Sequence, residues 1–174
     1  MPGRFALLFR QHEGALISAW VDGVYAERRT DLPGLLSYRQ LVDSVPELLE
    51  ELARALDDAA DGREIEVCVR SLRMHSQVRF QQGCLIDEVA RELMILRRVL
   101  TDFLWREGVG VTEGDLRELR DALARADLFV DELIAQAIIV YAASMRPPVR
   151  TRTPQWPPPR RRRHTDNPDR EGSW

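Results

Sequence analysis

Apolar residues recur at intervals of three and four positions along most of this chain, which is the period of one face of an α-helix. Five long segments show the pattern: residues 4–29, 45–60, 64–82, 85–107 and 116–140. A shorter helix is predicted at 38–43, after a turn at Pro33-Gly34, and a bend is predicted at Gly14. No segment alternates apolar and polar residues consistently enough to predict a strand. The pattern predicts an all-α fold, arranged as an antiparallel helical bundle.

Local signals mark several of the helix ends. Gly83 is expected to end a helix in the left-handed conformation, because a residue without a Cβ atom adopts it at little cost. The break there is short, so the helices on its two sides should lie antiparallel and adjacent. Ser44 is predicted to cap the helix that follows it. Thr112 and Asp115 form a capping-box variant at the start of the last helix.

Two polar residues interrupt the apolar face of segment 64–82. His75 and Arg79 occupy positions on that face, and the face is expected to meet the returning helix near Glu88 or Glu92. A buried charge without a partner would be costly. We therefore expect His75 and Arg79 to bond with one of these carboxylates, which would fix the angle between the two helices.

The same region carries a longer pattern, H-x-x-x-R-x-x-Q-G, then a hydrophobic residue, then L-x-x-E-x-x-x-L-R. The residues in those places are His75, Arg79, Gln82, Gly83, Val89, Glu92, Leu96 and Arg97. On these residues the chain resembles the N-terminal domain of the RsbT co-antagonist RsbRD family, over about residues 8–143. Two positions depart from the family pattern: Leu85 stands where a capping Ser, Thr or Asp is usual, and Leu93 where an aromatic residue is usual.

The resemblance implies a helical input module, of the kind found ahead of output domains in bacterial stress regulators and sensor histidine kinases. It also implies a globin-like fold without haem. The implied signalling or structural polar network consists of His75, Arg79, Gln82, Glu92 and Arg97. Three roles stay open for His75: a structural partner of Glu92, a sensing residue whose protonation rearranges the network, and a haem ligand. The structural role is favoured, because a buried polar group needs hydrogen-bond partners.

The last predicted helix carries two apolar strips, so it has the means to pack on its own domain and on a second subunit. One strip alternates by three and four residues over a long stretch, as a coiled-coil seam does. The positions assigned to a homodimer seam are Leu116, Leu119, Leu123, Val130, Leu133 and Val140. We expect a homodimer in which this helix passes a change in the polar network to a signalling partner, either a kinase or a STAS-type output protein.

Composition divides the chain at about residue 145. Residues 146–174 hold seven of the 10 prolines and eight of the 25 basic residues, all of them Arg, against three acids. The segment therefore carries +5, which leaves −8 of the net −3 charge for residues 1–145. We expect a helical domain over 1–145 and a disordered Pro/Arg-rich tail over 146–174. The tail also has the composition of a shifted reading frame, so we expect a truncated or orphaned input module.

The sequence shows no catalytic set, phosphate-binding loop or metal-ligand spacing. Cys68 and Cys84 are expected to be reduced, buried thiols. We predict a cytoplasmic, non-enzymatic signalling domain without a cofactor and without a membrane span. Two alternatives stay open. One is a nucleic-acid-associated protein that binds through Arg160–Arg163, against which the acidic charge of residues 1–145 argues. The other is a sensor of a small ligand or of haem.

Overall fold

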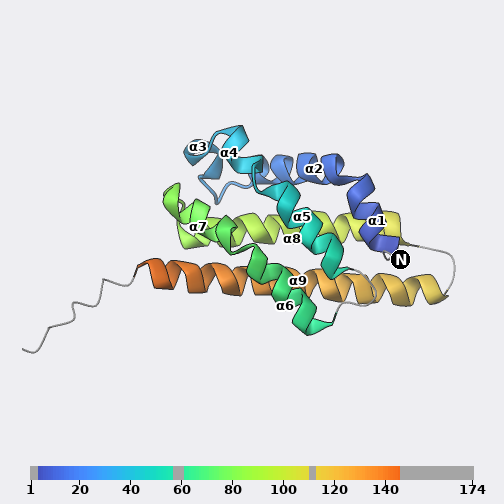
Figure 1. Cartoon of the computed structure of the whole chain (residues 1–174). Helices are drawn as coiled ribbons and strands as arrows, with labels where there is room; N and C mark the ends of the chain where they lie inside the picture. The colour runs from blue at the N-terminus through green and yellow to red at the C-terminus, as the bar shows by residue number, and fades with distance from the viewer. Residues whose placement is uncertain (1–3, 57–60, 110–112, 146–174) are drawn as a thin grey trace, which may run out of the picture.

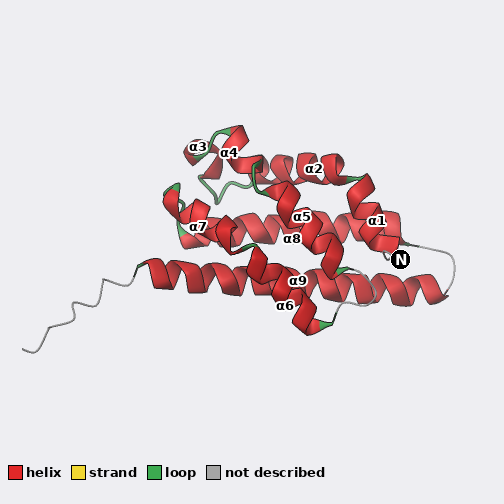
Figure 2. Ribbon diagram, in the orientation of Figure 1, coloured by secondary structure: helices red, strands yellow, loops and turns green. Residues whose placement is uncertain are grey.

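The computed structural model describes residues 4–56, 61–109 and 113–145, and these are helical apart from short connections (Figure 2). The helices are α1 (Arg4–Gln11), α2 (Glu13–Ala26), α3 (Leu32–Leu35), α4 (Tyr38–Val42), α5 (Val45–Ala55), α6 (Gly62–Ser71), α7 (Arg73–Gln81), α8 (Ile86–Gly108) and α9 (Glu113–Ser144). The prediction of an all-α fold is confirmed. The segment 146–174 predicted to be a disordered tail lies outside the described residues.

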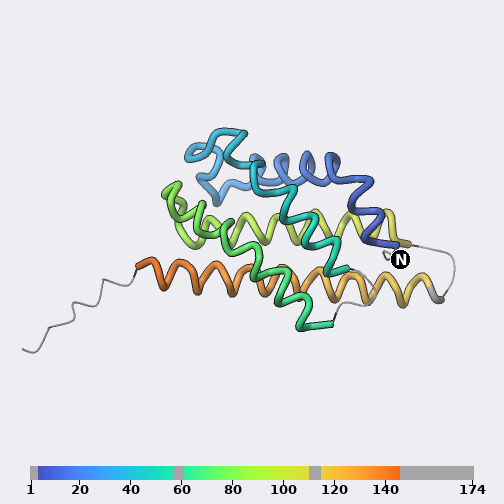
Figure 3. Tube along the Cα trace, in the orientation of Figure 1, coloured from blue at the N-terminus to red at the C-terminus, as the bar shows by residue number. Residues whose placement is uncertain are grey.

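The two longest helices, α8 and α9, run antiparallel and side by side through the middle of the molecule (Figures 1 and 3). Helix α2 packs on the other side of α8, and α5, α6 and α7 cross the pair. The periodic face of α8 predicted from the sequence is the buried one: Val89, Leu93, Leu96, Leu100 and Phe103 are all in the core. They share one hydrophobic cluster with residues from α1 to α9.

The first predicted helix is two helices, and the break falls at His12 rather than as a bend at Gly14. His12 has φ −112° and ψ 15°, and its ring lies 5.5 Å from that of Phe103. The reorientation lets α1 pack on α5 while α2 packs on α8. The buried residues of the two helices, such as Phe9 and Trp20, thus reach different parts of the core.

A second break divides the predicted helix 64–82 at Leu72, between α6 and α7. Asp61 caps the start of α6: its carboxylate accepts from the backbone N–H groups of Arg63 and Glu64. Both helices pack chiefly on α9, and α7 contacts α9 more extensively than α8. The two helices joined by the Gly83 turn are therefore less closely paired than the short connection suggested.

The turn between α7 and α8 has the conformation expected from the sequence. Gly83 has φ 81°, in the left-handed region. The Gly83 N–H donates to the carbonyl of Phe80, and the Cys84 N–H donates to that of Arg79. The Tyr141 hydroxyl of α9 donates to the Cys84 carbonyl at 2.8 Å, so the turn is also fixed to the last helix.

Two helix caps were predicted, at Ser44 and Thr112, and the first prediction is wrong. Ser44 precedes α5, but its side chain makes no capping hydrogen bond and is used elsewhere. Ser37, at the start of α4, forms a full capping box with Gln40 instead. The predicted capping residue Thr112 lies outside the described residues.

Most of the apolar stripe of α9 that was predicted to form a homodimer seam lies in the protein's own core. Leu119, Val130, Leu133 and Val140 are buried within a single chain. Leu123 is partly buried against the same core, and only Leu116 is exposed. The reason is that α6, α7 and α8 already cover this side of α9. Any contact of α9 with a second subunit would use its other side.

Candidate functional site

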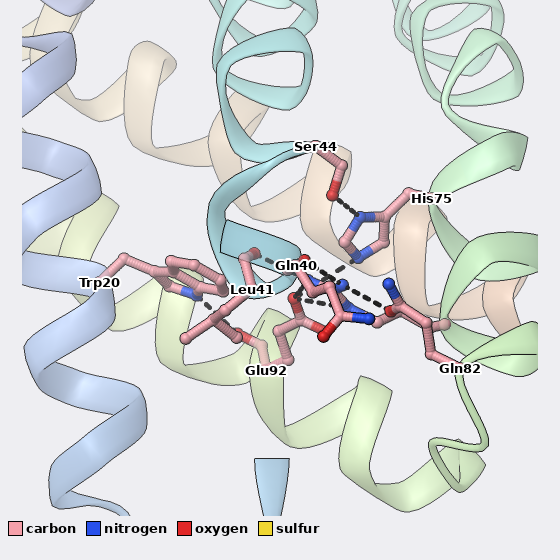
Figure 4. A network of polar contacts seen from close by, with 8 residues as sticks. Trp20, Gln40, Leu41, Ser44, His75, Gln82 and Glu92 are labelled. Carbon is pink, nitrogen blue, oxygen red and sulfur yellow. Dashed lines mark hydrogen bonds and ion pairs between the residues drawn. The ribbon is translucent and has the colours of Figure 1, made fainter. Parts of the chain in front are cut away.

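Four elements meet around a buried group of polar side chains. Figure 4 shows His75 and Gln82 from one side and Glu92 from another converging on the end of α4, near Gln40 and Ser44. Arg79, on α7 between His75 and Gln82, is the central residue, and only 1% of its surface is exposed. We refer to His75, Arg79, Gln82 and Glu92 as the buried network.

The centre of the buried network is an ion pair between Arg79 and Glu92. Nη2 of Arg79 lies 2.7 Å from Oε1 of Glu92, and Nε lies 3.0 Å from Oε2. Both carboxylate oxygens therefore accept from the guanidinium, in the two-point geometry that gives the strongest Arg–carboxylate pairs. Glu92 comes from α8 and is 1% exposed, so the pair joins α7 to α8 inside the core.

Arg79 also holds the end of α4. Its Nη1 donates to the Gln40 carbonyl and its Nη2 to the Leu41 carbonyl, both at 2.9 Å. These carbonyls belong to the last turn of a five-residue helix, where no further helical N–H follows to bond them. Nη1 donates as well to Oε1 of Gln82 at 3.0 Å. All five N–H groups of the guanidinium thus have acceptors, which explains how a charge is tolerated at this depth.

The carboxyl group of Glu92 is held in its ionised form. Burial alone would raise its pKa, but the neighbouring His75 and Arg79 outweigh burial and lower the pKa to about 2. The backbone of Glu92 contributes a further contact, since its carbonyl accepts from the indole N–H of Trp20 at 3.3 Å. Glu92 therefore connects α8 to α7 through its side chain and to α2 through its main chain.

His75 lies at the edge of the ion pair. Its Nδ1 is 2.7 Å from the hydroxyl oxygen of Ser44, and its Nε2 is 3.7 Å from Oε1 of Glu92. No hydrogen-bond partner for this buried Nε2 is present among the described residues. A lone pair on Nε2 would face a carboxylate, whereas a proton there would be attracted to it. The surroundings therefore favour a hydrogen on Nε2, with Nδ1 accepting from Ser44.

Four of the five residues predicted for the network are brought together, and the fifth is not. Arg97 lies on the surface between α8 and α9, where it pairs with Asp131, and its Nε lies 3.9 Å from Asp127. It follows Glu92 by five residues, about 140° around the helix, so it cannot share a face with that residue. Glu88, the other acid considered for His75 and Arg79, accepts instead from the Thr30 hydroxyl and the Asp31 N–H.

Sequence reasoning missed the partners contributed by α4 and α2. Ser44 was expected to cap a helix, and the roles of Gln40 and Leu41 involve only their carbonyl groups. A backbone acceptor leaves no pattern of residue types, so no sequence signal identified those two. For Trp20, a buried indole N–H that needs an acceptor was the one available hint.

The arrangement is suited to holding helices rather than to chemistry. The charges of Arg79 and Glu92 neutralise one another, and neither side chain is reached by solvent. Within the described ranges, no group of three or more His, Cys, Asp or Glu residues is placed to hold a metal ion. None of the described helices is both long enough and apolar enough to cross a bilayer.

Comparison with known proteins gave one match. The family model described as the RsbT co-antagonist protein rsbRD N-terminal domain matches residues 14–153, which include all four residues of the buried network. No curated protein and no solved structure matches significantly.

Proposed function

This chain belongs to the family of the RsbT co-antagonist protein rsbRD N-terminal domain, and from that premise we propose that it is a non-enzymatic input domain of bacterial stress or two-component signalling. The family is regulatory and non-catalytic, and its name places it in stress signalling. In this proposal the domain receives a cue and passes it to an output protein, either a kinase or a STAS-type protein, by a change in helix packing.

The observation that supports a conformational mechanism is the position of Arg79. One guanidinium fixes the end of α4, the side chain of Gln82 on the turn after α7, and Glu92 of α8. A rearrangement of this group would release or reorient several helices together, because each depends on the same donor. A contact shared by several helices can exist in two arrangements, formed and rearranged. A cue that favours one arrangement shifts the population of the domain toward it.

His75 is the residue of the buried network that has a ring nitrogen without a hydrogen-bond partner among the described residues. Its Nε2 lies near Glu92 without a hydrogen bond to it, at 3.7 Å. A small movement of α7 toward α8 would form that bond, and a movement away would weaken the attraction. In the proposed mechanism α7 has two packing arrangements, and the contact between His75 and Glu92 shifts their relative populations. The ion pair between Arg79 and Glu92 is kept in both arrangements.

Homodimerisation is part of the proposal, through the side of α9 that faces away from the core. The segment 133–145 contains no charged residue, although Ile138, Ile139 and Met145 are exposed there. Apolar side chains on an uncharged helix surface are stabilised when a second surface covers them. A second copy of the chain, offering the same strip, would bury it symmetrically.

Cysteine crosslinking tests the dimer surface. In a background without Cys68 and Cys84, a cysteine at Ile139 should form an intersubunit disulfide under mild oxidation. A cysteine at Arg120, exposed on the more charged half of α9, serves as the matched control and should not crosslink. Native mass spectrometry of the unmodified protein gives the oligomeric state independently. A monomer at all accessible concentrations would contradict the dimer.

A genetic experiment tests the signalling role. Deleting the gene in its host should alter the transcription of stress-response genes after a defined stress and leave unstressed growth unchanged. Reintroducing the wild-type gene should restore the response. A variant that is folded but locked in its packing, such as one with an engineered disulfide between α4 and α7, should fail to restore it. An unchanged stress response in the deletion strain would overturn the proposal.

A further inference from the structure

A second polar cluster, separate from the buried network, lines a pocket beside α8. Beside the end of α2, α8 borders a pocket of about 300 Å³ whose charged lining is Glu27, Arg29, Arg91, Arg97 and Arg98. Four guanidinium groups therefore surround a single carboxylate. The signalling role does not explain this concentration of positive charge.

The acids nearby do not neutralise the arginines. Glu27 is shared, since Arg29 donates to it at 2.9 Å and Arg98 lies 3.5 Å from its other oxygen. Arg97 pairs outward with Asp131 on α9. No ion pair within the described part of the chain involves Arg91. Arg97 also lies 3.9 Å from Asp127, so Arg91 is the arginine of this lining that has no ion-pair partner within the described ranges.

Two buried nitrogen atoms beside this pocket lack hydrogen bonds to the described part of the chain. The Nε atoms of Arg91 and Arg97 are both out of reach of solvent, and neither has a hydrogen-bond acceptor among the described residues. A buried N–H without an acceptor destabilises the fold, and more so when the group is charged. An anion within the pocket would provide acceptors and offset the charge, and guanidinium groups bind phosphate and carboxylate oxygens in a two-point manner.

The rest of the pocket defines the ligand further. Met94 and Ile95 contribute its apolar lining, and Met94 is exposed at its edge. Arg91 and Arg98 are seven residues apart on α8, so they lie about 10 Å apart along one side of the helix. Two arginine side chains are long enough to reach one anionic group placed between them, and an apolar part of the same molecule would lie on Met94 and Ile95.

We propose that this pocket binds a small organic anion, with a phosphate or carboxylate group held by Arg91 and Arg98 and an apolar part on Met94 and Ile95. The pocket also adjoins the contact between α2 and α8. Its lining residue Ile95 packs against Gly23 of α2, where a Cβ atom on the glycine would lie 2.7 Å from Ile95 Cγ2. A ligand there would therefore touch the side chain that sets the spacing of the two helices.

Calorimetric titration of the purified full-length chain tests the site with three probes: phenyl phosphate, benzoate and phenol. Phenyl phosphate or benzoate should bind saturably with one site per chain, and phenol, which lacks the charge, should not. The stronger of the two anions identifies whether phosphate or carboxylate is preferred. Absence of saturable binding by both anions would overturn the proposal.

Matched variants separate a built site from general attraction to a basic surface. Arg91→Met and Arg98→Gln should each weaken binding by about tenfold or more, as expected for losing a charged hydrogen bond. Arg106→Gln removes the same charge from α8 outside the pocket and should leave the affinity unchanged. An equal loss with Arg106→Gln would show nonspecific attraction and refute the site. The thermal midpoint of each variant, unchanged from wild type, shows that the fold is retained.

Discussion

Arg79 approaches Glu92 through two different nitrogen atoms, Nη2 at 2.7 Å from Oε1 and Nε at 3.0 Å from Oε2, and both side chains are buried. The same guanidinium holds the carbonyl groups of Gln40 and Leu41. The pair therefore has two separable roles: neutralising a buried carboxylate, and capping a short helix. Substitutions can distinguish them.

Removing one partner of the pair should be strongly destabilising. Arg79→Met leaves Glu92 as an uncompensated buried charge, and we expect a loss of about 3–5 kcal/mol in the free energy of unfolding, measured by urea denaturation. Arg70→Gln is the control, because Arg70 pairs with Glu66 on the surface and such pairs contribute about 0–1 kcal/mol. A loss for Arg79→Met no greater than for Arg70→Gln would contradict the role of the pair.

The double substitution Arg79→Met with Glu92→Leu isolates the capping role. Replacing a buried ion pair by apolar residues is often neutral, so the charge penalty should disappear. The carbonyls of Gln40 and Leu41 would still lack their donor, which costs about 1–3 kcal/mol for the buried Leu41 carbonyl and less for the partly exposed one of Gln40. We therefore expect the double variant to be more stable than Arg79→Met but less stable than wild type.

Acid should weaken the fold through Glu92. The carboxyl has a folded pKa of about 2, below the ordinary value of 4.5 that applies in the unfolded chain, so the unfolded state binds a proton first as pH falls. The contribution, about 3 kcal/mol, is complete above pH 4.5 and is lost progressively between pH 4.5 and 2. Urea denaturation across this range should show the difference between wild type and Glu92→Gln shrinking as pH falls. A difference independent of pH would contradict the assignment.

Much of the site was predictable because polar residues stand out on an apolar helix face. His75 and Arg79 recur with Leu72 on one face, and all three are buried. Arg97 shares the family pattern, but a pattern of letters does not state which side of α8 a residue occupies, and its side is the surface. The stripe of α9 shows the same limit: periodicity reveals an apolar face but not whether the covering surface belongs to the same chain.

The helix breaks at His12 and Leu72 were not predictable for a related reason. Neither position is itself the glycine or proline that interrupts helices locally; Gly14, where a bend was predicted, lies two residues past the first break, and α1 and α2 pack on different helices, α5 and α8. Gly83, by contrast, adopts φ 81° in a turn that its lack of a Cβ atom favours, so that boundary was correctly predicted.

The uncapped start of α8 offers a way to stabilise the protein. Leu85 is the N-cap residue with the usual extended backbone, φ −78° and ψ 158°, but its side chain makes no capping bond and is exposed. Leu85→Ser would supply an oxygen to a free N–H of the first turn and should raise the free energy of unfolding by about 1 kcal/mol. Leu85→Ala is the control and should give no gain. Thermal and urea unfolding of both variants check the prediction.

Tyr141 fixes the turn before α8 to the last helix through its hydroxyl. Tyr141→Phe keeps the ring, which lies 5.2 Å from that of Phe80, and removes the bond to the Cys84 carbonyl. We expect a loss of about 1 kcal/mol at neutral pH. Burial raises the pKa of the phenol to about 12 from its ordinary value of 10, so its contribution is present below pH 10 and lost between pH 10 and 12. A rise of two pKa units corresponds to about 2.7 kcal/mol, more than the bond contributes, so wild type should lose its advantage above pH 10 and be less stable than Tyr141→Phe near pH 12. A difference independent of pH would contradict the assignment.

The two glycines of α2 should respond in opposite ways to alanine. A Cβ atom at Gly14 would meet nothing within 4 Å, so Gly14→Ala should stabilise the helix by up to about 1 kcal/mol through its higher helix propensity. At Gly23 the Cβ atom would lie 2.7 Å from Ile95 Cγ2, a methyl group that stands on a stiff, β-branched side chain. Overpacking costs about 1–3 kcal/mol and outweighs the gain in propensity, so Gly23→Ala should be net destabilising. The variant Gly23→Ala with Ile95→Val keeps that methyl group and should recover little, whereas Gly23→Ala with Ile95→Ala removes the clash and should cost less than the sum of its single substitutions. Strict additivity in this double-mutant cycle, measured by urea unfolding, would show that α2 and α8 do not meet at these two residues.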